Sequence, residues 1–227
     1  MSNWTTFGVG GPARFFVAAK TENDVAEGLD FAASRKLPVF VLGGGSNLLV
    51  ADRGVAGIVL HIGLTGMRWD GAELLAGAGE PWDGVVAACV ERGLHGVECL
   101  SGIPGLAGGT PVQNVGAYGQ EAAESVAGVR VLDRRAGRIA ELPAAACGFG
   151  YRASIFNTSQ KDRYVILAVR YRLRREPRHR ALYPDLARRF EGKPEPSLVE
   201  LRSAVCEIRR SKGMLIVDGD PDCRSAG

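Results

Sequence analysis

The chain has 227 residues, of which 46% are hydrophobic and 23% charged, an ordinary composition for a globular protein of one or two domains. Five widely spaced cysteines without a Cys-x-x-Cys pair and three isolated histidines argue against a disulfide framework or a zinc site. No apolar run approaches the roughly 20 residues that span a bilayer, and the N-terminus lacks a signal-peptide pattern. We therefore expect a cytoplasmic protein with no membrane partner.

The net charge of +3 is unevenly distributed along the chain. Residues 1–150 contain 11 Lys/Arg and 15 Asp/Glu, which gives −4, and residues 151–227 contain 17 Lys/Arg and 10 Asp/Glu, which gives +7. A basic C-terminal part fits an anionic ligand such as a nucleotide, or nucleic acid. A solvated basic face explains the same bias, so charge alone leaves these alternatives open.

Three strands and one helix are predicted in the first 66 residues. The strands cover Ala13–Ala19, Pro38–Leu42 and Gly57–Ile62. Thr21, followed three residues later by Asp24, marks the start of a helix after the first strand. This β-α-β order predicts a small α/β unit over residues 1–66.

A second unit is predicted over residues 67–175. Pro81–Glu91 has the apolar spacing of a helix. Predicted strands, the middle two joined by a tight basic hairpin, are Leu74–Gly79, Val129–Asp133, Ile139–Leu142 and Tyr164–Leu173.

The remaining residues, 176–227, change in character. Glu176–Pro196 is rich in Pro and Arg and is predicted to be an excursion or a linker. Ser197 and Glu200 form a capping box that begins an amphipathic helix ending at Gly213. The polar stretch 218–227 is predicted to be turn-like.

Gly43–Asn47 follows a buried strand. Consecutive N–H groups in a glycine turn can form a nest for a diphosphate, to which Ser46 and Asn47 add donors. The loop lacks the Lys-Ser/Thr of a Walker A motif, and a plain turn is the alternative. Gly8–Ala13 imitates a dinucleotide fingerprint but precedes its strand, which argues against a Rossmann fold.

Leu100–Gln120 is rich in glycine and has little side-chain bulk. Such a segment suits a flat ligand with polar ring edges, to which Gln113 and Asn114 offer amides and Tyr118 a ring and hydroxyl. A long surface loop is the alternative, but structureless loops of this length are uncommon in compact domains unless functional.

Arg152 stands among aromatic residues in the segment Tyr151–Phe156. An arginine in this setting can bind a carboxylate. It can equally be a surface cation packed by its aliphatic stem, and spacing alone favours that interpretation.

Taken together, these segments resemble the UDP-N-acetylenolpyruvoylglucosamine reductase family. Its motifs occur here in order and spacing: TTFGVGGPA at 5–13, GGGSNLLVAD at 43–52, LSGIPG through QNVGAYGQE at 100–121 and YRASIF at 151–156. RSAG at 224–227 continues the match. The resemblance implies an α+β FAD-binding fold of the vanillyl-alcohol oxidase (PCMH) type, with two α/β subdomains around the flavin and a third, substrate-binding domain mostly missing.

The resemblance also implies an activity. NADPH would reduce bound FAD, and the flavin would pass hydride to the enolpyruvyl group of UDP-N-acetylglucosamine enolpyruvate, making UDP-N-acetylmuramate for peptidoglycan precursors. FAD is then the cofactor, NADPH the co-substrate and a UDP-sugar the substrate. We expect a monomer without a nucleic-acid partner.

Site residues follow from the same resemblance. Arg152 is the implied catalytic residue, binding the enolpyruvyl carboxylate. Substrate contacts are implied for Tyr151, Tyr183, Arg209 and Lys212. FAD contacts are implied for Gly43, Gly44, Gly45, Ser46, Asn47, Leu48, Gly102, Ile103, Pro104, Gly105, Gly109, Gln113, Asn114, Gly116 and Tyr118.

Two departures from the family pattern affect these expectations. In the family a proton-donating serine follows RSAG and a catalytic glutamate lies further on, so we expect a fragment that binds FAD weakly and does not complete turnover. Ala153 replaces the acidic residue of YRDSIF. The alternatives are another FAD-dependent oxidase or dehydrogenase of the superfamily, or a nucleotide- or RNA-binding module, which lacks interleaved exposed aromatics.

Overall fold

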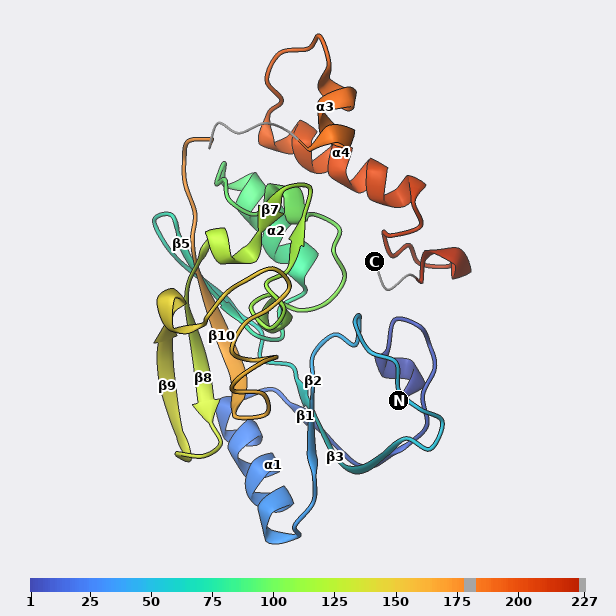
Figure 1. Ribbon diagram of the computed structural model, residues 1–227, viewed down its shortest axis with the longest axis vertical. Helices are drawn as coiled ribbons and strands as arrows, with labels where there is room; N and C mark the ends of the chain where they lie inside the picture. Colours follow the sequence, from blue (N-terminus) through green and yellow to red (C-terminus); the bar gives the residue numbers. More distant parts are fainter. Residues whose placement is uncertain (178–182, 225–227) are drawn as a thin grey trace.

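A three-stranded parallel sheet organises the N-terminal part of the chain (Figure 1). The computed structural model describes residues 1–177 and 183–224. In the sheet, β3 (Val55–Ile62) lies between β1 (Ala13–Ala19) and β2 (Val39–Leu42). α1 (Glu22–Ser34) packs against it and begins with the expected capping box of Thr21 and Asp24. The predicted β-α-β start is confirmed.

A five-stranded antiparallel sheet follows, with the strand order β4-β5-β10-β8-β9. Its strands are β4 (Met67–Asp70), β5 (Glu73–Gly77), β8 (Val126–Asp133), β9 (Arg138–Pro143) and β10 (Tyr164–Arg172). Four of the five were predicted, and β4 was missed because four residues are too few to show an alternating pattern. The predicted boundary at residue 66 falls between the last strand of one sheet and the first of the other, and the division into domains stays a prediction.

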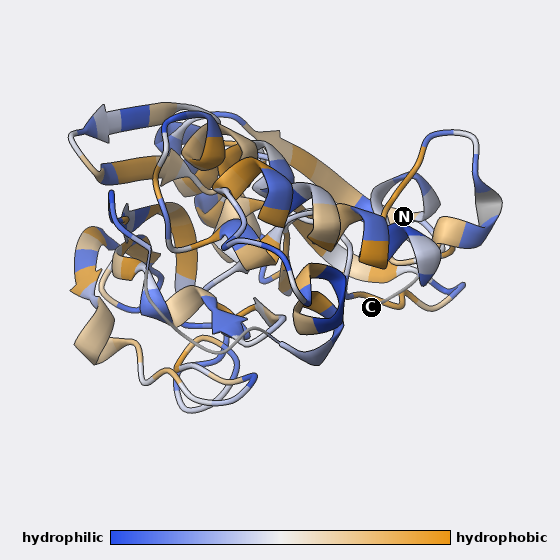
Figure 2. Ribbon diagram, turned by 90° about the horizontal axis from the view of Figure 1, so that it is seen from above, coloured by the Kyte–Doolittle hydropathy of each residue, from blue (hydrophilic) through white to orange (hydrophobic). Residues whose placement is uncertain are grey.

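One hydrophobic core joins the two sheets. It contains Leu60 of the parallel sheet, Val129 and Tyr171 of the antiparallel sheet, and Trp82 of α2 (Trp82–Glu91). Trp82 is only 1% exposed, and its indole Nε1–H donates to the Leu100 carbonyl at 3.1 Å. Helices and strands are banded in hydrophobic and hydrophilic residues in Figure 2, the pattern of elements buried on one face.

The C-terminal part adds two helices, drawn in orange and red at one end of the molecule in Figure 1. α4 (Leu198–Ser211) begins with the predicted capping box of Ser197 and Glu200. The prediction of a linker over Glu176–Pro196 is wrong for α3 (Pro184–Phe190). Proline at the first helical position favours this start, but a helix of two turns shows little periodicity. Residues 178–182 of that predicted linker lie outside the described ranges.

Short elements occupy the connections. Two-residue strands β6 (Gly116–Ala117) and β7 (Gln120–Glu121) pair with each other. Single 3-10 turns cover Ser2–Trp4, Glu98–Leu100, Ala107–Gly109, Ala122–Glu124, Ala144–Ala146 and Pro221–Cys223. No helix within residues 1–177 and 183–224 has the length and hydropathy needed to cross a bilayer.

The β8–β9 hairpin is closed by a buried carboxylate. Asp133, 6% exposed, accepts from the backbone N–H groups of Arg135 and Ala136 and from the Arg163 guanidinium at 2.6 Å. Hydrogen bonds from Arg163 lower the pKa of Asp133 from its ordinary value of 3.8 to about 2. A depressed pKa means that the ionised carboxylate stabilises the fold above pH 4 and loses this effect as the pH falls towards 2.

We predict that Asp133→Asn flattens the acid limb of the stability profile. The free energy of unfolding, measured in urea between pH 6 and pH 2.5, should fall less steeply for the variant than for the wild type, because the variant has no carboxylate to protonate. Asp162→Asn, on the neighbouring exposed turn, is the matched control and should follow the wild type. Parallel profiles for Asp133→Asn and wild type would contradict the prediction.

Candidate functional site

The central cleft is a cavity of about 680 Å³ between the two sheets' connecting loops. Its walls are formed by the loop 43–48 after β2, the segment 103–117 and Arg152. Arg209, near the end of α4, and Met214, just after this helix, complete the lining. This volume is within the range of ligand-binding cavities, about 300–1,000 Å³. The cleft is therefore the candidate site.

The loop Gly43–Leu48 offers unused hydrogen-bond donors to the cleft. Among the described residues, none accepts a hydrogen bond from the backbone N–H groups of Gly44, Gly45, Ser46 or Asn47. Gly45 has a left-handed φ of +64°, and a Cβ there would overlap the carbonyl oxygen of Trp4. The loop is thus an N–H-rich turn of the kind that binds anions.

The two glycine segments touch each other through backbone. A Cβ on Gly44 would lie 2.8 Å from the Cα of Gly105, so a side chain there would force the segments apart. Ser46 Oγ donates to the Pro104 carbonyl at 3.1 Å, and Asn47 Nδ2 donates to Gln113 Oε1 at 2.5 Å. The side chains of Ser46, Asn47 and Gln113 therefore connect the walls of the cleft.

A hydrogen bond connects the segment 102–117 to the hydrophobic core. Thr110 Oγ1 and the Tyr171 hydroxyl lie 2.7 Å apart, and both residues are buried. Desolvation raises the pKa of Tyr171 and keeps the hydroxyl protonated. Thr110 lines the cleft, so this pair anchors its floor on β10.

Asn114 shapes the segment from behind. Its Nδ2 donates to Glu121 Oε2 at 2.7 Å and to the Gly150 carbonyl at 3.0 Å, and its Oδ1 accepts from the Ala123 N–H at 2.9 Å. Its φ of +43° is left-handed. Protein partners thus use both ends of the amide, and a contact of Asn114 with a ligand stays a prediction.

Arg152 also lines the cleft. Its Nη2 donates to the Gly116 carbonyl at 2.6 Å, and its Nη1 lies 3.5 Å from the Asn114 carbonyl. Tyr151, 83% exposed, has its ring 5.4 Å from the guanidinium carbon. The guanidinium is therefore fixed by backbone while retaining donors for an anion.

Arg209 reaches the cleft from α4 and is 6% exposed. Its Nε donates to the Gly102 carbonyl at 3.0 Å and its Nη2 to the Met214 carbonyl at 2.8 Å. A buried guanidinium with these two partners holds the end of α4 against the glycine-rich segment.

A cluster of four side chains lies outside the central cleft and consists of Tyr118, Tyr183, Asp185 and Lys212. The rings of Tyr118 and Tyr183 meet edge to face with centroids 5.7 Å apart, and Lys212 Nζ donates to Asp185 Oδ2 at 2.6 Å. Tyr118 is half-buried, and desolvation raises its pKa. The expected substrate residues Tyr183 and Lys212 thus lie together, and each already has a protein partner.

The structure gathers most of the expected cofactor residues in the cleft. Lining the cavity are Gly43, Gly44, Gly45, Ser46, Asn47, Leu48, Ile103, Pro104, Gly105, Gly109, Gln113 and Gly116. Gly102, Asn114 and Tyr118 do not line it. Cleft residues that sequence reasoning missed are Val41, Trp82, Leu106, Thr110, Val112, Val115, Ala117 and Met214. A signal was within reach for the five that lie inside the predicted segment Leu100–Gln120, namely Leu106, Thr110, Val112, Val115 and Ala117. The individual ligand contacts stay predictions.

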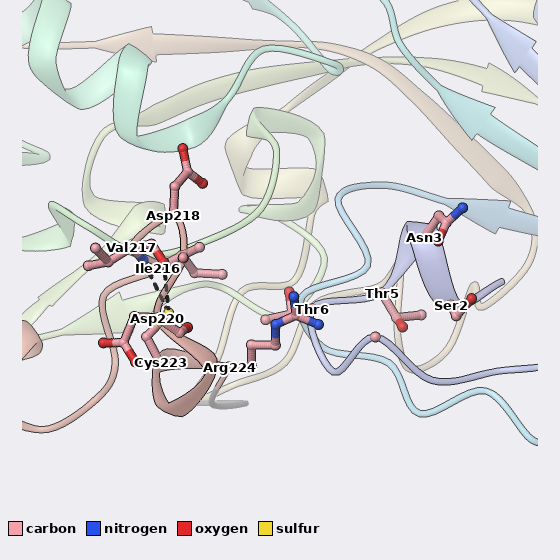
Figure 3. Close-up of a pocket in the computed structure, with 12 residues that line it drawn as sticks. Ser2, Asn3, Thr5, Thr6, Ile216, Val217, Asp218, Asp220, Cys223 and Arg224 are labelled. Atoms are coloured by element: carbon pink, nitrogen blue, oxygen red, sulfur yellow. Dashed lines mark hydrogen bonds between the residues drawn. The ribbon is translucent and has the colours of Figure 1, made fainter.

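A second cavity, the terminal cleft, lies between the N-terminal turn and residues 216–224 and measures about 640 Å³ (Figure 3). Figure 3 shows Arg224 extending towards Thr6. The Cys223 thiol is turned into its own loop, where it accepts from the Val217 N–H at 3.1 Å. Asp218 and Asp220 also line this cleft, so it is less suited to an anion than the central cleft. The described residues contain no group of His, Cys, Asp and Glu that could hold a metal ion.

A family model described as FAD binding domain matches residues 13–143. The UDP-N-acetylenolpyruvoylglucosamine reductase of Thermobifida fusca is 46% identical over 237 aligned residues, covering 100% of this chain and 65% of the relative. That of Saccharopolyspora erythraea is 44% identical over 235 residues, covering 100% and 64%. The chain thus spans slightly less than two thirds of the length of these relatives.

Solved structures agree. A UDP-N-acetylenolpyruvylglucosamine reductase from Thermus caldophilus matches with a TM-score of 0.68 at 29% identity, covering 100% of this chain and 70% of the other. A 6-hydroxy-D-nicotine oxidase from Arthrobacter nicotinovorans matches with a TM-score of 0.54 at 20% identity, covering 76% and 40%, which shows a shared fold alone. The predicted resemblance and the predicted fold class are confirmed.

We predict that Gly45→Ala destabilises the chain by about 1–3 kcal/mol, because a left-handed φ disfavours alanine and its Cβ would displace Trp4. The matched control is Gly43→Ala in the same loop. A Cβ at Gly43 meets nothing within 4 Å, so the control should change stability by no more than about 0.5 kcal/mol. Urea unfolding measures both, and equal stabilities of the two variants would contradict the assigned backbone geometry.

Proposed function

Because the chain belongs to the FAD binding domain family, we propose that its central cleft holds FAD and that the chain forms the flavin-binding part of a UDP-N-acetylenolpyruvoylglucosamine reductase. The observation that carries this proposal is the pair of glycine segments in backbone contact, with unpaired N–H groups on one and a fixed arginine beside the other. The reaction is the reduction of UDP-N-acetylglucosamine enolpyruvate to UDP-N-acetylmuramate, a precursor of peptidoglycan.

The residues present fit the cofactor. The N–H groups of Gly44–Asn47 suit the diphosphate, because they are donors without acceptors among the described residues, just after the end of β2. The segment 103–116 suits the flat ring system, because Ile103, Pro104 and Val112 give it an apolar wall and its backbone approaches without bulky side chains. The cleft volume is within the ordinary range for ligand sites.

Bound flavin supplies hydride transfer, and the protein supplies binding and orientation. We assign to Arg152 the binding of the enolpyruvyl carboxylate. Two of its N–H groups are engaged by the Gly116 and Asn114 carbonyls, which fixes the guanidinium and leaves other donors for the carboxylate. A guanidinium fixed in advance stabilises negative charge that develops there during hydride addition. NADPH is the proposed hydride source.

The contacts of the UDP-sugar are proposed for the group outside the central cleft. Tyr183 packs on Tyr118, and Lys212 binds Asp185, two residues further along the chain from Tyr183, so the group offers a ring and a cation to a nucleoside diphosphate. Tyr151 is largely exposed next to Arg152 and can cover the enolpyruvyl group. Arg209 would act at the junction of α4 and the glycine-rich segment, where its guanidinium is buried.

We predict that the chain binds FAD with one site and that riboflavin, which lacks the diphosphate, binds at least tenfold more weakly, the loss expected when a charged group forfeits its hydrogen bonds. Titration monitored by flavin fluorescence measures both ligands. Equal affinity for riboflavin and FAD would argue against the diphosphate site, and no FAD binding would overturn the proposal.

The same loaded protein separates the reductase from an oxidase of shared fold. Anaerobic NADPH should bleach the visible absorbance of the bound flavin, and UDP-N-acetylglucosamine enolpyruvate should perturb it. Bleaching by an alcohol substrate in place of NADPH would favour an oxidase.

We predict that Arg152→Met weakens the binding of UDP-N-acetylglucosamine enolpyruvate about tenfold or more, because the carboxylate loses a charge-assisted partner. The affinity for UDP-N-acetylglucosamine, which lacks the enolpyruvyl carboxylate, should stay within about twofold, since this ligand makes no use of the missing charge. Calorimetry on the FAD-loaded chain measures both. An equal loss for the two ligands would show that Arg152 does not bind the carboxylate.

A further inference from the structure

Gly102 begins the glycine-rich wall of the central cleft, and charged side chains hold both of its backbone polar groups. Its N–H donates to Asp83 Oδ1 at 2.6 Å, and its carbonyl accepts from Arg209 Nε at 3.0 Å. Its φ is +68°, and a Cβ there would come within 2.8 Å of Leu215 Cδ1. Because glycine allows many backbone conformations, these two partners select the one that is observed.

Asp83 lies in the first turn of α2 and does not line the cleft. Its two carboxylate oxygens also accept a bidentate pair of hydrogen bonds from Arg202 on α4, both at 2.7 Å. Arg202 and Arg209 are seven residues apart, which places them on one face of the helix. A single carboxylate thus connects α2, α4 and the Gly102 peptide.

The Asp83 carboxylate is ionised in this setting. Burial by itself raises its pKa, but the hydrogen bonds from Arg202 and from the Gly102 N–H outweigh burial and hold the pKa below its usual value. A hydrogen bond from a backbone N–H to an ionised carboxylate is shorter and about twice as strong as a neutral one. The contact between Asp83 and Gly102 is therefore a strong constraint on the first peptide of the wall.

Three residues that line the cleft follow Gly102 directly. Ile103 and Pro104 form part of the apolar wall, and Gly105 meets Gly44 of the facing loop. A rotation of the Gly102 peptide would move all three at once. The orientation of this one peptide consequently decides whether the wall and the facing loop come together.

We propose that Asp83 is a positioning residue of the flavin site: it orients the Gly102 peptide and thereby places residues 103–105 against the cofactor. This inference rests on the proposed binding of FAD. The competing interpretation is that Asp83 only docks α4 through Arg202, in which case the contact with Gly102 has no effect on the cleft.

Three variants separate the two interpretations. Asp83→Ala removes the acceptor for Gly102 and the partner of Arg202. Arg202→Met removes the ion pair and leaves the acceptor. Asp83→Asn loses the charge but keeps an oxygen that can accept the Gly102 N–H. Glu22→Ala is the matched control, because Glu22 also stands in the first turn of a helix and binds Arg130 through two hydrogen bonds, away from the cleft.

The expected result is a loss of FAD affinity of about tenfold or more for Asp83→Ala, as for one charge-assisted hydrogen bond. Arg202→Met, Asp83→Asn and Glu22→Ala should stay within about threefold of the wild type. Fluorescence titration gives the affinities, and visible circular dichroism of the bound flavin reports its placement. Equal losses for Asp83→Ala and Arg202→Met would overturn the proposal in favour of simple helix docking.

Hydrogen exchange of the ligand-free chain gives a second, independent readout. Asp83→Ala should increase the exchange of the segment 102–106, whereas Arg202→Met should not. If the wild type binds no FAD, the proposed function fails, and this measurement still decides whether Asp83 orients Gly102. Unchanged exchange in Asp83→Ala would overturn the positioning role. Urea unfolding verifies that each variant is folded under the conditions of measurement.

Discussion

The contact between Gly44 and Gly105 is the constraint on which the rest of the site depends. It brings the loop between β2 and β3 of the parallel sheet against a segment supported by the antiparallel sheet. No side chain fits between the two backbones. Side-chain bonds on either side, from Ser46 to Pro104 and from Asn47 to Gln113, keep the two backbones in register. The cleft owes its width to this approach, since one methyl group would widen it.

Each wall of the cleft is in turn held by neighbouring groups, of which Asp83 does not line the cleft and Arg209 does. The glycine loop rests on Trp4, and the wall at 102–105 is held between Asp83 and Arg209. The groups that hold this backbone are the Trp4 carbonyl and the charged side chains of Asp83 and Arg209. Backbone held in this way suits a site that must present many N–H groups in a fixed direction while leaving room for a large, flat ligand.

The sequence predicted the elements that have a local signal. Strands with alternation and helices with capping boxes at Thr21 and Ser197 were predicted to within three residues of their observed bounds, and the glycine clusters led to the two walls of the cleft. Contacts between distant residues left no such signal. Nothing near Asp83 in the chain indicates that it binds Gly102 and Arg202. In the same way, nothing near Asn114 indicates that its side chain binds Gly150 and Ala123. The chemistry assigned to the site came from the family motifs, because spacing alone left a plain turn or a surface cation as alternatives.

The participation of Arg209 and Met214 in the cleft has a consequence for biosynthesis. Both glycine segments have been made by residue 117, yet the cavity lacks part of its lining until Met214 has been added, 97 residues later. At the usual rates of translation, roughly 5–20 residues per second, that interval lasts about 5–20 s. Throughout this interval the nascent chain carries two glycine-rich walls to which α4 has not yet been added. The cavity therefore gains its full lining only after α4 and Met214 have been made.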